Sequence, residues 1–120
     1  MADILVVDDD EVIRDTLCEL LEANYSCQTA ETAEEALARL ETQRFDIVLT
    51  DISMPGLSGT ELLNRVREQY PGTPVIIVSG HSDHEQAQGL ISNGAFDYLL
   101  KPFRLEMVEE SVKRAVSRSR

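Results

Sequence analysis

Five polar residues stand directly at the ends of apolar runs in the sequence, at points where predicted strands finish. They are Asp8, Asp9, Asp51, Ser79 and Lys101. Together they offer three carboxylates, a hydroxyl and an ammonium group. Each has a plainer explanation when taken alone, since an aspartate before a turn is most often a turn former. In a parallel sheet, however, the carboxyl ends of neighbouring strands share one edge, so the five side chains are expected to surround one crevice.

Three carboxylates in one crevice repel one another unless a cation lies among them. A shell of oxygens with no His or Cys beside it favours a hard ion, Mg²⁺ before Mn²⁺ or Ca²⁺. With Lys101 counted, a divalent ion would balance the local charge. The run Asp8-Asp9-Asp10 also disfavours a resident flavin phosphate. A carboxylate beside two cations is well placed to attack phosphorus, and Asp51 is the expected nucleophile.

The elements that must hold these residues alternate along the chain. Predicted strands cover 4–7, 25–29, 45–50, 75–78 and 96–100. The first and fourth are apolar throughout and the third is mostly apolar, which is typical of strands covered on both faces, whereas 25–29 alternates and is expected at an edge. The pattern predicts an α/β fold, a flavodoxin-like (βα)5 three-layer sandwich. With right-handed crossovers, its parallel five-stranded sheet has the order 2-1-3-4-5.

Amphipathic segments between the strands predict five helices. A Ser or Thr followed three residues later by Glu predicts capped starts at Thr32, Ser58 and Ser82, and Asn24 is expected to end the first helix. The apolar residues expected on the buried sides of the last two helices are Ala87, Leu90, Ile91, Leu105, Val108, Val112, Ala115 and Val116.

The chain has 120 residues, 42% of them hydrophobic, which fits one domain over residues 1–120. A net charge of -11 argues against direct contact with nucleic acid or an anionic membrane. No signal peptide or membrane-spanning run is recognisable, so a cytoplasmic location is expected. Cys18 and Cys27 match no zinc or CxxC spacing and are expected to be reduced, structural thiols.

The chain resembles the receiver domain of two-component response regulators over essentially its whole length. The matching segments are Val7-Asp8-Asp9, Asp51-Ile52-Ser53-Met54-Pro55-Gly56, Ser79-Gly80 and Lys101-Pro102-Phe103. Each is weak alone, but all four in this order and spacing are specific. The resemblance implies that Asp51 accepts a phosphoryl group from a histidine kinase or a histidine phosphotransfer protein. It implies a phosphorylation switch rather than an enzyme.

The same resemblance implies the ligands of the site. Asp8 and Asp9 would hold Mg²⁺, with Asp51 and the backbone carbonyl of Ser53 completing the protein ligands. Lys101 would pair with the phosphoryl oxygens, and a cis peptide bond is predicted between Lys101 and Pro102.

A conformational switch is also implied. After phosphorylation, the hydroxyl of Ser79 would donate to the phosphoryl group and Tyr98 would turn inward. The face made by the fourth helix, fifth strand and fifth helix would then signal to an output domain, a protein partner or a second copy in a phosphorylation-dependent homodimer. Tyr98 fits equally well as an amphipathic ring at a sheet edge. Ser53 and His81 are hypothesised to set the lifetime of the acyl phosphate, although His81 also reads simply as a loop residue.

Two other functions are weighed. Phosphohydrolases of the haloacid dehalogenase type carry a second aspartate two residues after the nucleophile, where this chain has Ser53. A receiver that works without phosphorylation is disfavoured by the complete acidic set with Lys101. The basic residues near the end, such as Lys113 and Arg114, fit either a link to an output domain or simple pairing with a helix dipole, so a stand-alone receiver and one from a longer regulator both stay open.

Overall fold

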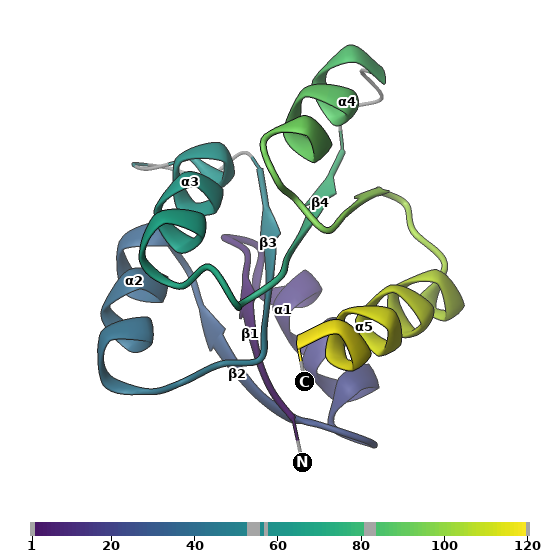
Figure 1. The fold of residues 1–120 in the computed structure, drawn as a ribbon. Helices are drawn as coiled ribbons and strands as arrows, with labels where there is room; N and C mark the ends of the chain where they lie inside the picture. Colours follow the sequence, from purple (N-terminus) through teal and green to yellow (C-terminus); the bar gives the residue numbers. More distant parts are fainter. Residues whose placement is uncertain (1, 53–55, 57, 81–83, 120) are drawn as a thin grey trace.

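A five-stranded parallel sheet with the order β2-β1-β3-β4-β5 forms the centre of the molecule (Figure 1). The structure is a computed structural model, and it describes residues 2–52, 56, 58–80 and 84–119. The strands are β1 (Asp3–Val7), β2 (Ser26–Ala30), β3 (Ile47–Asp51), β4 (Val75–Ser79) and β5 (Asp97–Leu100). The predicted order is confirmed, with β2 at an edge, and the predicted strand bounds shift by only one or two residues.

Helices cover both faces of the sheet. They are α1 (Glu11–Leu21), α2 (Ala33–Thr42), α3 (Gly59–Gln69), α4 (His84–Ser92) and α5 (Leu105–Ser119). In Figure 1, α2 and α3 lie on one side of the strands and α5 on the other. Buried residues of α1 and α5 share one apolar cluster with the sheet, and those of α2, α3 and α4 share a second cluster on the opposite face. The predicted three-layer sandwich is therefore confirmed.

The alternation of side chains in β1 shows how one strand serves both layers. Leu5 and Val7 belong to the cluster with α2 and α3, whereas Ile4 and Val6 belong to the cluster with α1 and α5. All four side chains are buried, because the sheet is covered on both faces. This double burial is the reason why the strand reads as an unbroken apolar run.

Side-chain caps begin three of the helices. Asp10 accepts from the N–H of Val12 at 2.9 Å, and Thr32 Oγ1 accepts from the N–H of Glu35 at 3.1 Å. Ser58 Oγ likewise accepts from a backbone N–H in the first turn of α3. The predicted caps at Thr32 and Ser58 are confirmed, and the one at Ser82 lies outside the described residues. Helix α1 ends at Leu21, before the stop expected at Asn24.

Two residues expected on buried helix faces are instead exposed. Ile91 is 44% exposed and Leu105 is 42% exposed. Helix α4 packs beside β5, the edge strand, and Leu90 is the one buried residue among those of α4 whose burial is described. The side chain of Ala87, also expected to be buried, lies outside the described part of this helix. Leu105 is the first residue of α5, and the buried residues of this helix begin one turn later, at Val108. The two helices were predicted correctly, but the sheet does not cover every apolar residue on their predicted buried faces.

The expectation of two reduced thiols is wrong in this structure, because Cys18 of α1 and Cys27 of β2 form a disulfide. Their Cα atoms are 5.7 Å apart, within the range that a disulfide spans. The cause is the packing of α1 against the outermost strand, which brings the two side chains together. Periodicity placed each cysteine on its own element but gave no information about their mutual distance.

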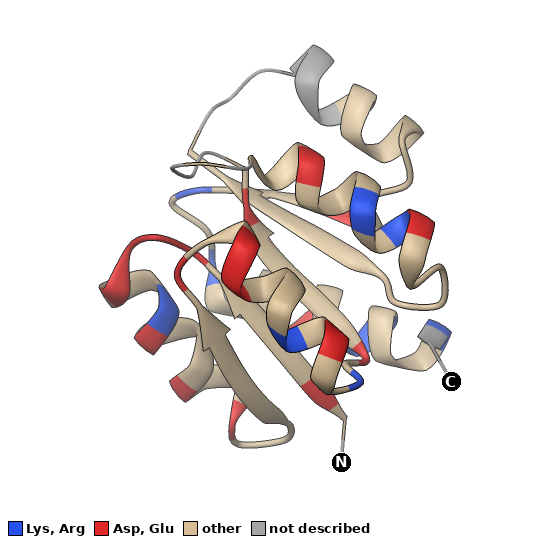
Figure 2. Cartoon of the chain, turned by 90° about the vertical axis from the view of Figure 1, so that its left-hand side faces the viewer, with Lys and Arg blue, Asp and Glu red and all other residues tan. Residues whose placement is uncertain are grey.

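Acidic residues are spread over the surface rather than gathered in one patch. Figure 2 shows red segments on several helices and loops, with fewer blue ones among them. This distribution fits the net charge of -11. Within the described part of the chain, no helix combines the length and the apolar composition that a membrane span requires.

A pair of leucines tests the layer arrangement. Leu62 of α3 is fully buried, whereas Leu105 is largely exposed. We expect Leu62→Ala to lower the free energy of unfolding by about 2–5 kcal/mol, because it leaves a cavity between α3 and the sheet. Leu105→Ala is the matched control and should change it by less than about 0.5 kcal/mol. Urea unfolding measures both, and equal losses in the two variants would contradict the assigned faces.

Candidate functional site

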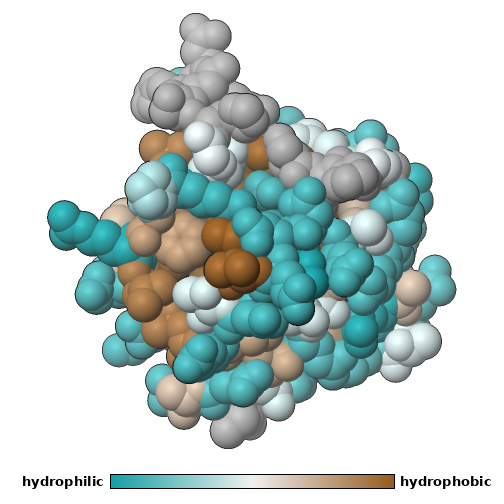
Figure 3. All heavy atoms as spheres, turned by 180° about the vertical axis from the view of Figure 1, so that it is seen from behind, coloured by the Kyte–Doolittle hydropathy of each residue, from teal (hydrophilic) through white to brown (hydrophobic). Residues whose placement is uncertain are grey.

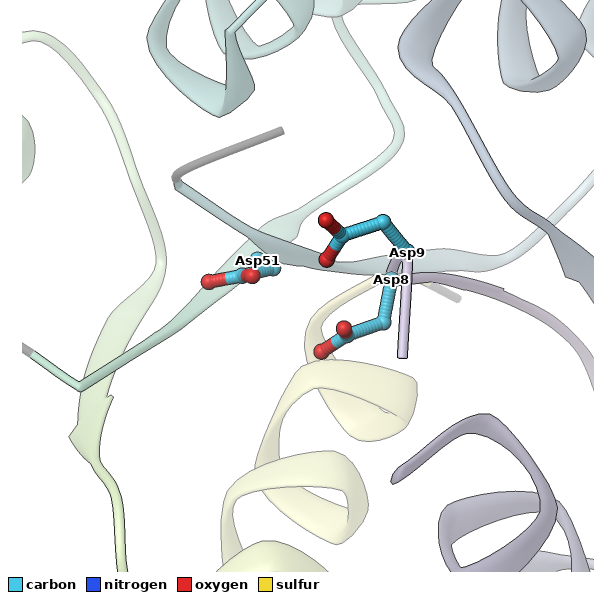
Figure 4. Close-up of side chains that lie close together, drawn as sticks. All are labelled: Asp8, Asp9 and Asp51. Carbon is cyan, nitrogen blue, oxygen red and sulfur yellow. The ribbon is translucent and has the colours of Figure 1, made fainter. Parts of the chain in front are cut away.

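Three carboxylates meet at the carboxyl edge of the sheet (Figure 4). One oxygen from each of Asp8, Asp9 and Asp51 lies within 4.8 Å of the other two. Asp8 and Asp9 follow β1, and Asp51 ends the neighbouring strand β3, so the pairing of these strands brings them together. Asp8 is 2% exposed and Asp51 is 7% exposed, whereas Asp9 is open to solvent. Two negative charges are thus held close together with little access to water.

Lys101, which follows β5, forms ion pairs with two of these carboxylates. Its Nζ lies 3.1 Å from Asp8 Oδ2 and 3.6 Å from Asp51 Oδ2. The backbone turns at a cis Lys101–Pro102 peptide, as predicted. The ammonium group therefore compensates part of the repulsion between the two buried aspartates.

Ser79 completes the set of strand ends. It is fully buried at the end of β4, and its carbonyl accepts a 2.7 Å hydrogen bond from the N–H of Lys101. Tyr98 lies on β5, half-buried and packed against the cluster that contains α2 and α3. The structure thus places Ser79 in direct contact with the backbone of Lys101. Ser53 and His81 lie outside the described residues.

Local hydrogen bonds fix the orientation of the aspartates. Asp8 Oδ1 accepts from the N–H of Asp10 at 2.9 Å, and Asp51 Oδ1 accepts from the N–H of Ile52 at 2.8 Å. Thr50 Oγ1 donates to the carbonyl of Asp51 at 2.9 Å. Each buried carboxylate therefore has one oxygen bonded to the backbone, while the other faces Lys101.

Arg14 belongs to the surroundings of the site and was missed in the sequence. Its Nη1 donates to the backbone carbonyl of Asp8 at 2.7 Å, and its Nη2 pairs with Glu31 at 3.4 Å. The residue is 8% exposed although it is charged. It stands three residues before Leu17 and seven before Leu21, on the buried stripe of α1. That spacing was the available signal, because a charged residue on an apolar stripe needs a buried partner.

Gly59 was also missed. Its N–H donates to the carbonyl of Ile52 at 2.9 Å, so the first turn of α3 lies directly against the end of β3. A Cβ atom at this position would meet the carbonyl oxygen of Asp51 and would lie 2.7 Å from the Cα of Ile52. Only glycine allows this close approach. Its position eight residues after Asp51 gives no signal in the sequence from which the contact could have been predicted.

The donor set fits a hard divalent cation. All three side chains offer carboxylate oxygens, which Mg²⁺ prefers over nitrogen or sulfur ligands. Two of them are buried and repel each other, and a single Lys101 ammonium does not balance three negative charges. Asp8, Asp9 and Asp51 are therefore the residues that could hold the ion.

Comparison with known proteins gives one consistent family. The family model described as "Response regulator receiver domain" matches residues 4–113. The chain is similar to the DNA-binding transcriptional regulator NtrC of Salmonella typhimurium, with 43% identity over 115 residues. It is also similar to the nitrogen assimilation regulatory protein NtrX of Azorhizobium caulinodans, with 37% identity over 117 residues. These matches cover 95% of the chain but only 24% and 26% of those regulators.

Solved structures of similar length agree with this result. A receiver domain from a Francisella response regulator superimposes with a TM-score of 0.94 and 32% identity, and covers 100% of both chains. A response regulator receiver domain protein from Clostridium thermocellum gives a TM-score of 0.91 and 35% identity, covering 98% of this chain and 96% of that one.

Two substitutions with the same change in charge test the metal site. We expect Asp8→Asn to weaken Mg²⁺ binding by about tenfold or more, because it removes a ligand charge from the cluster. Asp10→Asn is the matched control, since asparagine caps a helix as well as aspartate does and Asp10 is solvent-exposed. Calorimetric titration with Mg²⁺ compares the two variants. An equal loss in both would show that only the general negative charge matters.

Substitution of Gly59 tests the contact behind Asp51. We expect Gly59→Ala to lower the free energy of unfolding by about 1–3 kcal/mol, because the new methyl group pushes α3 away from the end of β3. Mg²⁺ affinity should fall as well, since Asp51 moves with its backbone. Gly72→Ala is the control, because a Cβ there meets nothing within 4 Å. Unchanged stability and Mg²⁺ affinity in Gly59→Ala would contradict the tight contact.

Proposed function

The chain belongs to the family of response regulator receiver domains, which act in two-component signal transduction, and from this premise we propose that Asp51 is its phospho-acceptor. The donor is a phosphohistidine of a sensor histidine kinase or of a histidine phosphotransfer protein. The observation that carries the proposal is the position of Lys101 Nζ, 3.1 Å from Asp8 and 3.6 Å from Asp51. A cation beside the acceptor carboxylate can neutralise the charge that develops on the transferring phosphoryl oxygens.

In the proposed reaction, a carboxylate oxygen of Asp51 forms a bond to phosphorus while the bond from phosphorus to the histidine nitrogen breaks. The electron pair of that bond returns to the imidazole. Asp8, Asp9 and Asp51, with the backbone carbonyl of Ser53, would hold Mg²⁺ or, as an alternative, Mn²⁺. When bound, the ion supplies neutralisation of charge on the phosphoryl oxygens. Lys101 would pair with the phosphoryl oxygens, and this interaction strengthens as negative charge develops on them.

The proposed switch starts from the change in charge at Asp51. Phosphorylation replaces one negative charge with about two, so further donors become favourable. The hydroxyl of Ser79, at the end of β4, is the proposed new donor, and Tyr98 on β5 would then turn inward. The support is backbone pairing, because Ser79 lies opposite Leu100 and accepts from Lys101. A shift of Ser79 is therefore passed to the strand that carries Tyr98.

The proposed signalling face is made by α4, β5 and α5. Of the described residues, five large apolar ones are exposed, and four of them lie on these elements, namely Ile91, Leu100, Leu105 and Met107. Seen from behind in Figure 3, brown surface gathers on the side where α4 and α5 lie, whereas the opposite side is mostly teal. Exposed apolar surface of this kind suits an output domain, a protein partner or a second copy after phosphorylation.

We propose that this domain makes no direct contact with DNA. NtrC is named a DNA-binding regulator, but the chain spans only 24% of its length. The net charge of -11 argues against direct binding of nucleic acid by this domain. We place the receiver, residues 1–120, in the cytoplasm, where a kinase can reach Asp51.

Phosphorylation with a small donor tests the function directly. Incubation with acetyl phosphate and Mg²⁺ should give one phosphoryl group per chain that is stable in acid and labile to base and hydroxylamine, as an acyl phosphate is. Asp51→Asn should abolish incorporation. Asp15→Asn, an exposed aspartate of α1, is the control and should behave like the unaltered chain. Intact mass measurement reports the result.

Two outcomes would contradict the proposal. Incorporation that survives Asp51→Asn would place the phosphoryl group elsewhere. Repeated turnover of an external phosphomonoester would show a phosphohydrolase instead of an acceptor.

A further inference from the structure

Two links join α1 to β2 and to the residue that follows it. The disulfide joins Cys18 to Cys27, and the ion pair joins Arg14 to Glu31. The two positions on α1 are four residues apart, which is about one helical turn, so they lie on the same side of the helix. Their partners are also four residues apart along the extended segment. The disulfide and the ion pair therefore lie next to each other, and both connect α1 to the segment 27–31.

The Arg14 end of the ion pair is connected to the acidic site by hydrogen bonds. Asp8 donates its N–H to the carbonyl of Ala30 at 3.1 Å and accepts at its own carbonyl from Arg14 at 2.7 Å. Its backbone is thus held on one side by the end of β2 and on the other by α1. The position of the Asp8 carboxylate depends on how α1 lies against β2, and this is what the disulfide fixes.

From this arrangement we infer that Cys18 and Cys27 form a thiol–disulfide site that regulates cation binding at Asp8, Asp9 and Asp51, with Arg14 as the positioning residue. The inference rests on the proposed function where it concerns phosphorylation, but its effect on Mg²⁺ binding is separate. Disulfides of proteins in reducing compartments are usually transient and redox-sensing. The disulfide lies one helical turn from Arg14, so its formation or reduction can act on Asp8 through the hydrogen bond from Arg14.

The chemistry needs a low-molecular-weight disulfide as the oxidant. Cys27 is more exposed than Cys18, so its thiolate attacks first and releases one small thiolate. The thiolate of Cys18 then attacks the Cys27 sulfur of the mixed disulfide and releases the second small thiolate. The two cysteines are oxidised and lose two protons, and the external disulfide is reduced to two thiols that take those protons up. A small dithiol reverses the sequence.

The expected effect is a difference in Mg²⁺ affinity between the two redox states. In the oxidised chain, α1 keeps Arg14 against the carbonyl of Asp8, and the acidic site is preorganised. In the reduced chain, this hydrogen bond from the charged guanidinium of Arg14 opens more often, and we expect Mg²⁺ to bind about fivefold more weakly. At Mg²⁺ concentrations below saturation, phosphorylation by acetyl phosphate should slow by a similar factor.

The experiment titrates Mg²⁺ into the chain after oxidation by oxidised glutathione and after reduction by dithiothreitol that is then removed. Free thiols are counted by maleimide labelling and mass measurement in both samples. Cys18→Ala/Cys27→Ala should show one affinity, close to that of the reduced chain, under both treatments. Arg14→Met should retain the disulfide but lose most of the redox difference, which a merely stabilising disulfide would not do.

Three results would overturn the inference. They are equal Mg²⁺ affinities in the oxidised and reduced chain, two free thiols after oxidation, and a full redox difference that persists in Arg14→Met. Failure of the proposed function looks different, because Asp51 then takes no phosphoryl group in either redox state while the two Mg²⁺ affinities still differ. If Asp51 is phosphorylated at the same rate and with the same Mg²⁺ dependence in both states, only the redox inference fails.

Discussion

The repulsion between two buried aspartates is the constraint on which the rest of this structure depends. Asp8 and Asp51 are almost completely removed from water, and burial of like charges destabilises a fold unless opposite charge is supplied. Lys101 supplies part of it from a third strand end. A bound divalent cation, as proposed above, would supply the rest. The same charge deficit that costs stability would then contribute to the affinity for that ion.

Sheet order makes this arrangement possible. The aspartates come from β1 and β3, which are neighbours, while Lys101 comes from β5 and reaches across β4. The hydrogen bond from the backbone N–H of Lys101 to the carbonyl of Ser79 holds Lys101 in this position. Residues separated by ninety-three positions in the chain, such as Asp8 and Lys101, become ion-pair partners because each stands where a parallel strand ends.

Apolar periodicity predicted the fold well because each strand and helix buries a regular face. The sheet order was predicted from right-handed crossovers with segment 25–29 at an edge, and the caps at Thr32 and Ser58 from the Glu three residues later. The convergence of Asp8, Asp9, Asp51 and Lys101 was predicted from the shared edge of parallel strand ends. What could not be predicted depends on distances between elements. The disulfide and the exposure of Leu105 follow from how a helix lies against an edge strand, and the need for Gly59 follows from one close backbone approach. Local patterns carry no record of such distances.

The two edge strands of the sheet are attached to their helices by different kinds of bond. Strand β3 is separated from each edge strand by a single strand, so Asp51 lies in the central strand, midway between the edge strands β2 and β5. The β2 border is tied to its helix by a covalent bond. The β5 border is tied to α5 by hydrogen bonds and an ion pair from Ser111 and Arg114 to Asp97. If phosphorylation of Asp51, as proposed, displaces β3, the covalent tie at β2 would oppose the displacement more than the non-covalent contacts at β5, and the motion would be directed toward β5.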